Sequence, residues 1–200
     1  MIVADRITKA FGANPLWSEL SFSVGRGEMF ALTGPSGAGK STLLNCLGLL
    51  ERVDSGTIQV SGRSITNLRA ASRRRFRRDT LGYLFQNYAL IENASVDTNL
   101  AVAGRREAFA SALRAVGLEG RGQEPVYRMS GGEQQRVAVA RLLIKKPTVI
   151  LADEPTAALD TDNTDLVLTL LRELADGGCA VVVATHSKEV EGRCDSALNL

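Results

Sequence analysis

Residues 34–41 combine glycines, a lysine and a serine at spacings suited to holding a phosphate chain. The run GPSGAGKS matches the pattern GxxxxGK(S/T) at every fixed position, between an apolar strand-like segment and a helix-forming one. Glycines let backbone N–H groups turn toward phosphate oxygens, and the following helix N-terminus adds partial positive charge. Lys40 can reach β- and γ-phosphates, and the Ser41 hydroxyl can ligate Mg²⁺. The alternative is a glycine-rich turn that binds nothing.

By itself this motif predicts only a site for a nucleoside triphosphate. The residues expected to bind the nucleotide here are Gly34, Pro35, Ser36, Gly37, Ala38, Gly39, Lys40, Ser41 and Thr42.

Two adjacent acids, Asp153 and Glu154, end a second apolar run, VILA at 149–152. Burying an unpaired carboxylate is costly, so both acids are expected to have a binding or catalytic role. Beside a phosphate loop, Asp153 would hold Mg²⁺ through water, and Glu154 would orient and partly deprotonate an attacking water. A kinase would not need that second carboxylate, so the pair favours hydrolysis. The alternative is a pair of exposed acids that begin a turn before Pro155.

A third group, Ser130 to Glu133, has the pattern of a helix start. Ser130 as N-cap and Glu133 three residues later form a capping box. The capping box does not explain Gly131 and Gly132, because glycine in a helix costs on the order of 1 kcal/mol relative to alanine. Glycines there would let an anion approach the free N–H groups closely. The pattern therefore indicates a second phosphate-binding helix end, far in sequence from the first.

The sequence predicts strands that alternate with helices to position these groups. The expected strands are Val3–Thr8, Ser21–Val24, Met29–Thr33, Thr57–Val60, Thr80–Phe85, Thr148–Ala152 and Ala180–Ala184. The expected helices are Lys40–Leu50, Gly131–Lys145 and Asn163–Ala175, with helical pieces at Val96–Ala103 and Glu107–Val116 inside a segment of different character. Continuous apolar strands are typical of a parallel sheet covered on both faces, whose ligand site lies at the strand carboxyl ends.

Composition suits one soluble domain of 200 residues, with 44% hydrophobic and 23% charged residues. The net charge of +2 is too small to argue for a polyanionic partner. We expect no signal peptide at the N-terminus, and no apolar run approaches the roughly 18 residues of a membrane span. Cys46, Cys179 and Cys194 are too widely spaced for a metal or disulfide framework.

The segment MSGGEQQRVAVAR (129–141), followed by LADEP (151–155) and by Ala158-Leu159-Asp160, resembles the signature region of ABC (ATP-binding cassette) ATPases. The resemblance covers essentially the whole chain. Met129 stands where the family usually has leucine, a residue of similar volume. The resemblance implies an α/β fold: a P-loop NTPase core with a parallel central sheet, an antiparallel β subdomain and an inserted α-helical subdomain. It implies a single domain over 1–200, with the core at about 1–86 and 130–200 and the helical subdomain at about 87–129.

The resemblance also implies roles for individual residues. Ser130, Gly131, Gly132 and Glu133 would bind the γ-phosphate of ATP held by a second subunit, so two copies would pair head to tail around two ATP molecules. Gln86 would ligate Mg²⁺ together with Ser41 and Asp153. His186 would contact the γ-phosphate, Asp160 would contact the opposite subunit, and Phe11 would stack on adenine. The implied catalytic residues are Glu154, His186, Lys40 and Gln86.

Three of these residues also have purely structural explanations. Gln86 could simply be a polar residue at a strand end. His186, the single histidine of the chain, could be structural, and Phe11 could belong to the core.

The segments FQNYALIENASV (85–96) and DEPTAALD (153–160) resemble the lipoprotein-release, macrolide-export and bacteriocin-export group of ABC ATPases. This implies a cytoplasmic subunit, peripheral at the inner face of the cell membrane, that powers export or release of a peptide, bacteriocin, drug or lipoprotein through a separate polytopic permease.

Two other classes of protein remain alternatives. An ABC ATPase acting on nucleic acid usually carries long coiled coils or zinc insertions, which are absent from the sequence. A P-loop kinase or GTPase is disfavoured by Glu154 and by the lack of an NKxD motif. The basic cluster of Arg69 and residues 73–78 is either a solvated surface or a contact for nucleic acid or anionic lipid.

Overall fold

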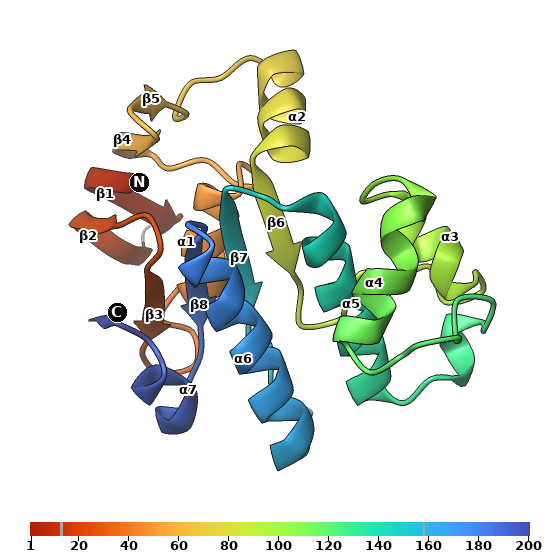
Figure 1. Ribbon diagram of the computed structural model, residues 1–200. Helices are drawn as coiled ribbons and strands as arrows, with labels where there is room; N and C mark the ends of the chain where they lie inside the picture. The colour runs from red at the N-terminus through yellow and green to blue at the C-terminus, as the bar shows by residue number, and fades with distance from the viewer. Residues whose placement is uncertain (13, 158) are drawn as a thin grey trace.

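Two β-sheets and a group of helices make up the protein, which a computed structural model describes at residues 1–12, 14–157 and 159–200 (Figure 1). The central sheet has five parallel strands in the order β6-β7-β8-β3-β9. Its strands are β3 (Met29–Thr33), β6 (Leu81–Leu84), β7 (Val149–Asp153), β8 (Ala180–Ala184) and β9 (Ser196–Asn199). Parallel strands require crossover connections, and these allow strands that are not consecutive in the chain to pair.

A second, antiparallel sheet of four strands in the order β2-β1-β4-β5 lies beside the central sheet. Its strands are β1 (Ile2–Phe11), β2 (Asn14–Val24), β4 (Ser55–Val60) and β5 (Arg63–Ser64). Together with the inserted helices, these sheets confirm the predicted fold class. The register of β1 shifts near Arg6, where the backbone has a φ of 45°. Such bulges twist a strand strongly.

Seven α-helices are described, and five of them flank the sheets. These five are α1 (Lys40–Leu47), α2 (Ala70–Asp79), α5 (Gly131–Lys145), α6 (Thr161–Asp176) and α7 (Lys188–Gly192). The other two, α3 (Val96–Ala101) and α4 (Phe109–Ala115), form a lobe with the 3₁₀ turns Arg106–Ala108 and Val126–Arg128. This lobe packs on α5, away from the antiparallel sheet (Figure 1). Within the described ranges, every helix is too short or too polar to span a bilayer.

The two faces of the central sheet pack into two separate apolar cores. Along β7, Val149 and Leu151 pack with α1 and the antiparallel sheet, whereas Ile150 and Ala152 pack with α5, α6 and the helical lobe. Because side chains alternate across a strand, a strand covered on both faces must be apolar at every position. This is why β7 and β8 read as continuous apolar runs, and the prediction of central parallel strands is confirmed.

Four helices and strands, α2, α7, β5 and β9, were absent from the sequence-based prediction. The arginine-rich segment forms α2, where Phe76 is the one buried residue of the helix. The segments that form α7 and β9 are short, and their sequences lack a clear period. β9 exists because it pairs with the edge of β3, from Phe30↔Ser196 to Thr33↔Asn199. Tertiary pairing therefore decides a strand that local propensity does not mark.

Gly82 gives a direct test of the packing between β6 and α5. A Cβ at this position would lie 2.5 Å from Leu142 Cδ2 and 2.7 Å from Pro147 Cγ. We expect Gly82→Ala to lower the free energy of unfolding by about 1–3 kcal/mol, the usual range for overpacking. Urea unfolding measures this change.

Gly192→Ala is the matched control, because a Cβ there meets nothing within 4 Å. An effect of Gly82→Ala no larger than that of the control would contradict the tight β6–α5 contact.

Candidate nucleotide-binding and catalytic site

The phosphate-loop motif forms the turn between β3 and α1, as the sequence predicts. Gly34 has a φ of 135°, and a Cβ there would lie 2.8 Å from the backbone oxygen of Leu200. Gly39, the N-cap residue of α1, has a φ of 92°. A Cβ on Gly39 would lie 2.9 Å from Trp17 Nε1. Both positions therefore require glycine on conformational and on steric grounds.

Lys40 lies over this loop and Ser41 faces the end of β7. The Lys40 ammonium donates hydrogen bonds to the carbonyl oxygens of Gly34 (2.8 Å) and Pro35 (3.0 Å). The Ser41 hydroxyl donates to Asp153 Oδ1 at 3.0 Å. Burial raises the pKa of Asp153, and the Ser41 hydrogen bond opposes that rise. The loop and the end of β7 thus bring together the Lys40 ammonium, the Ser41 hydroxyl and the Asp153 carboxylate.

Glu154 lies at the carboxyl end of β7 in a left-handed backbone conformation, with a φ of 46°. Its backbone N–H donates to the oxygen of Ala184, at the end of β8, over 2.9 Å. Its carboxylate contacts His186 Nδ1 at 2.8 Å and the Thr185 hydroxyl at 3.4 Å. An ionised carboxylate only accepts hydrogen bonds, so Nδ1 carries the proton. The Glu154 side chain is 16% exposed and that of His186 is 71% exposed.

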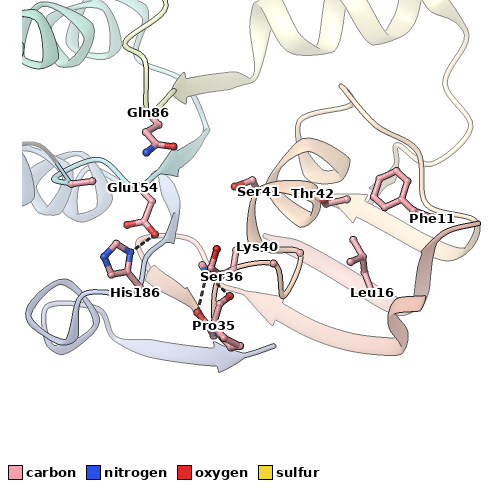
Figure 2. A pocket seen from close by; sticks show the side chains of 14 residues that line it. Phe11, Leu16, Pro35, Ser36, Lys40, Ser41, Thr42, Gln86, Glu154 and His186 are labelled. Carbon is pink, nitrogen blue, oxygen red and sulfur yellow. Dashed lines mark hydrogen bonds and ion pairs between the residues drawn. The ribbon is translucent and has the colours of Figure 1, made fainter. Parts of the chain in front are cut away.

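A cleft of about 650 Å³ joins these groups to the predicted adenine side. Figure 2 shows Gln86, Glu154 and His186 on one wall and Phe11 and Leu16 on the other, with the phosphate loop between them. The lining residues are Phe11, Leu16, Gly34, Pro35, Ser36, Gly37, Gly39, Lys40, Ser41, Thr42, Gln86, Glu154, Ala157 and His186. Among the expected loop residues, Ala38 does not line the cleft, and its N–H donates to Pro35 O.

Phe11 is not a core residue, because 56% of its surface is exposed. The buried ammonium of Lys9 lies 5.2 Å from the centre of its ring. Lys9 Nζ also contacts Glu51 Oε1 at 3.0 Å and Asp54 Oδ1 at 3.5 Å, so its charge is balanced. The ring is therefore supported by a cation on one side and open to the cleft, which leaves it free to stack on a base.

The Ser130–Glu133 group does not line this cleft. It forms the start of α5, where the predicted capping box is present: Glu133 N–H donates to Ser130 Oγ (3.3 Å) and Ser130 N–H to Glu133 Oε2 (2.8 Å). Arg121, from the helical lobe, binds Glu133 and Glu124. The Arg121 hydrogen bond, followed by that of the Ser130 N–H, lowers the pKa of Glu133 to about 2.

Asp160 lies apart from the cleft as well, and it is the N-cap of α6. Asn163 links it to α5: its amide donates to Asp160 Oδ2 at 2.8 Å, and its oxygen accepts from Arg136 at 2.7 Å. The roles of Asn163, Arg136 and Arg121 were not predicted from the sequence. The spacing of Asp160 and Asn163 could have revealed a cap, but the link to α5 depends on tertiary packing. Ala158, within the segment resembling the family, lies outside the described residues.

The cleft can bind a nucleoside triphosphate by its phosphates, hold an activated water beside Glu154 and accept the water's proton. These are the features of a P-loop nucleoside-triphosphate hydrolase. Residues 17–157 match the sequence profile of the ABC transporter family. The chain therefore belongs to that family, and it is an ABC-type ATP hydrolase. The resemblance stated from the sequence is confirmed.

Several relatives carry transport functions in their names. The chain is 40% identical over 192 residues to the lipoprotein-releasing system ATP-binding protein LolD 1 of Caulobacter vibrioides, covering 90% of this chain and 82% of that protein. It is 39% identical over 190 residues to the macrolide export ATP-binding/permease protein MacB of Shigella flexneri, covering 90% of this chain but only 29% of MacB.

A solved structure has the same fold. The dimeric ATP-binding cassette MJ0796, in a post-hydrolysis state bound to ADP and Pi, superposes with a TM-score of 0.91 at 30% identity. The match covers 100% of this chain and 94% of that one.

The low pKa of Glu133 predicts a pH-dependent contribution to stability. A carboxyl group whose pKa falls from its ordinary 4.5 to about 2 on folding stabilises the folded state above pH 4.5 and loses this effect as pH falls toward 2. Glu133→Gln should therefore unfold at lower urea than wild type at pH 7, and the gap should narrow below pH 4.5. Urea titrations at several pH values measure it. A gap that stays constant with pH would contradict the Arg121–Glu133 interaction.

Proposed function

We propose that this chain powers export or release of a substrate through a separate membrane permease, with ATP held between two copies of the chain. One observation carries the proposal: of the two glycine-containing helix starts suited to an anion, only the one before α1 lines the chain's own cleft, and the one before α5 does not. The Ser130 helix start, whose first-turn glycine N–H groups have no partner within the helix, then serves the nucleotide of a second copy. The dimeric form of the MJ0796 cassette supports this arrangement.

In the proposed mechanism, the phosphate loop and Lys40 hold the β- and γ-phosphates and Phe11 stacks on adenine. Glu154 accepts a proton from the attacking water. The His186 hydrogen bond fixes the direction of that carboxylate, and the exposed imidazole edge remains available to the γ-phosphate. The catalytic residues are thus Glu154, His186, Lys40 and Gln86.

Mg²⁺ fits the oxygen atoms that face the loop. The Ser41 hydroxyl already contacts Asp153, and the Gln86 amide lines the same cleft. Within the described residues, no group of three or more His, Cys, Asp or Glu could hold a metal alone. This suits Mg²⁺, which is usually held by one or two carboxylates together with substrate phosphates. Ser41, Gln86 and Asp153 would therefore hold Mg²⁺, which when bound would supply positive charge beside the phosphates.

The head-to-tail dimer gives the remaining residues their roles. Ser130, Gly131, Gly132 and Glu133 contact the partner's γ-phosphate, and Asp160 contacts the partner subunit. The Asp160–Asn163–Arg136 chain of hydrogen bonds holds both elements in one geometry. A division into a core at about 1–86 and 130–200 and a helical subdomain at about 87–129 lets the helical subdomain, which packs on α5, move relative to the phosphate loop.

The proposed class of transported substrate is based on the names of related proteins. Relatives named for lipoprotein release and macrolide export point to a lipoprotein, peptide, bacteriocin or drug as the cargo. The permease is a polytopic membrane protein, and the chain works in the cytoplasm at the inner face of the cell membrane.

Glu154→Gln tests the catalytic assignment. The amide keeps the size of the side chain but cannot accept the water's proton, so hydrolysis should fall by roughly 10²–10⁴-fold while ATP still binds. With less negative charge facing the γ-phosphate, the variant should also accumulate as an ATP-bound dimer. Phosphate release and size-exclusion chromatography, with and without ATP, measure both effects. Turnover at the wild-type rate would refute the role of Glu154.

Ser130→Arg tests the role of the signature helix in the partner's site. The arginine would crowd the partner's γ-phosphate and remove the N-cap, which costs about 1 kcal/mol of helix stability. The variant should bind ATP as a monomer but fail to hydrolyse it. Lys40→Ala, which alters the cleft itself, should instead lose ATP binding. Fluorescent-nucleotide titration separates the two, and loss of binding in folded Ser130→Arg would contradict action across the dimer.

A further inference from the structure

The basic helix α2 has no part in the nucleotide site. Six arginines and one aspartate lie between residues 69 and 79, so this segment carries more positive charge than the net +2 of the whole chain. In Figure 1, α2 stands at the amino end of β6, whereas the nucleotide cleft lies at the carboxyl ends of the strands. Its charge therefore serves something other than ATP.

Local contacts do not neutralise this charge. Within the described residues, the single salt bridge of the segment joins Arg78 to Asp79 at 2.6 Å, and the Arg78 side chain is 73% exposed. Lys145 adds a further cation at the end of α2, where its ammonium donates to the oxygen of Arg77 at 3.1 Å. The Arg78 hydrogen bond lowers the pKa of Asp79, and the charges of Arg75 and Lys145 lower it further.

The spacing of the arginines lowers the stability of the helix. Arg74 and Arg78 are four residues apart, as are Arg73 and Arg77, and like charges at this spacing destabilise a helix. A helix of 10 residues is too short to be stable alone, and Phe76 is its one buried anchor. An anionic surface outside the protein would offset this repulsion.

Three of the six arginines share one exposed face, as contact with a flat partner requires. With about 100° between successive residues of an α-helix, Arg74, Arg75 and Arg78 lie within about 100° of one another, on the face turned from Phe76. All three are exposed. The one aromatic residue of the segment, Phe76, is buried, so no ring is available to stack on a nucleic-acid base.

We propose that α2 binds the anionic headgroups of the membrane leaflet beside the permease. This inference rests on the proposed place of the chain at a membrane. Basic residues act on anionic lipid over about one Debye length, roughly 8 Å at physiological salt, so α2 must face the bilayer closely. The contact holds the ATPase at the membrane surface without touching its nucleotide cleft.

Vesicle co-sedimentation of the isolated chain tests the proposal. Wild type should bind vesicles of phosphatidylcholine with phosphatidylglycerol, bind phosphatidylcholine alone weakly, and detach at high salt. The triple variant Arg74→Gln, Arg75→Gln, Arg78→Gln should lose roughly a hundredfold in binding, at about fivefold per arginine.

The matched control is Arg52→Gln, Arg105→Gln, Arg106→Gln, which removes the same charge from exposed arginines elsewhere. It should bind vesicles nearly as wild type does. Equal loss in both triple variants, or no loss in the α2 variant, would overturn the proposal. So would tighter binding of α2 to a DNA duplex than to the vesicles, because the surface would then be a nucleic-acid contact.

ATP hydrolysis separates this proposal from the proposed function. The α2 variant should keep the basal ATPase rate of wild type, since α2 and the cleft lie at opposite ends of the sheet. Failure to bind lipid with normal ATPase activity would reject the lipid contact alone. A wild-type chain that hydrolyses no ATP yet binds the vesicles through α2 would reject the proposed function alone.

Discussion

The burial of the parallel sheet on both faces is the constraint from which the site follows. Every residue of β3 and β8 is buried, so their backbone groups must pair within the sheet. Parallel pairing brings the carboxyl ends of β3, β6, β7 and β8 to one edge. The phosphate loop, Gln86, Glu154 and His186 follow directly after these four strands. Their convergence is thus a consequence of packing, and a register shift in any one strand would dismantle the cleft.

Polar groups at that edge satisfy one another. Ser41 binds Asp153, and His186 binds Glu154. The left-handed φ of Glu154 is unfavourable for a residue with a side chain, and its N–H bond to Ala184 O holds it there. This conformation turns the carboxylate away from β7 and toward the cleft. The backbone strain and the position of the proposed base thus have the same origin.

Helix α5 ties together regions that are distant in sequence. It begins at the Ser130 cap, and Gln135 Nε2, inside the core, donates to Pro155 O at 2.7 Å, beside the acid pair. Farther along, Arg141 donates to the backbone oxygens of Tyr88 and Ala89, in the segment after Gln86. A rigid helix with these three contacts fixes the signature group, the end of β7 and the start of the helical lobe in one frame. Movement of the helical lobe would therefore shift α5 and, through it, the residues at the carboxyl end of β7.

Much of the site could be predicted from the sequence, because its parts are local. The glycines of residues 34–39, the acid pair and the capping box can each be recognised within a short segment of the sequence. The glycines meet a local need of the backbone, and the capping box meets a local need of the helix end. The two-sided burial of β7 and β8 is likewise evident from their uninterrupted apolar residues. The resemblance to ABC ATPases then supplied Gln86, His186 and Phe11, whose local patterns are ambiguous.

Only the tertiary structure decided how these parts meet. The separation of Ser130 from the cleft, the Asn163 link between Asp160 and Arg136, and the cation of Lys9 beneath Phe11 all join residues from different elements. β9 forms because β3 offers an unpaired edge, and α2 forms as a helix anchored by Phe76 despite its repelling charges. Such contacts depend on chain segments brought together by the shared core, so no local pattern encodes them.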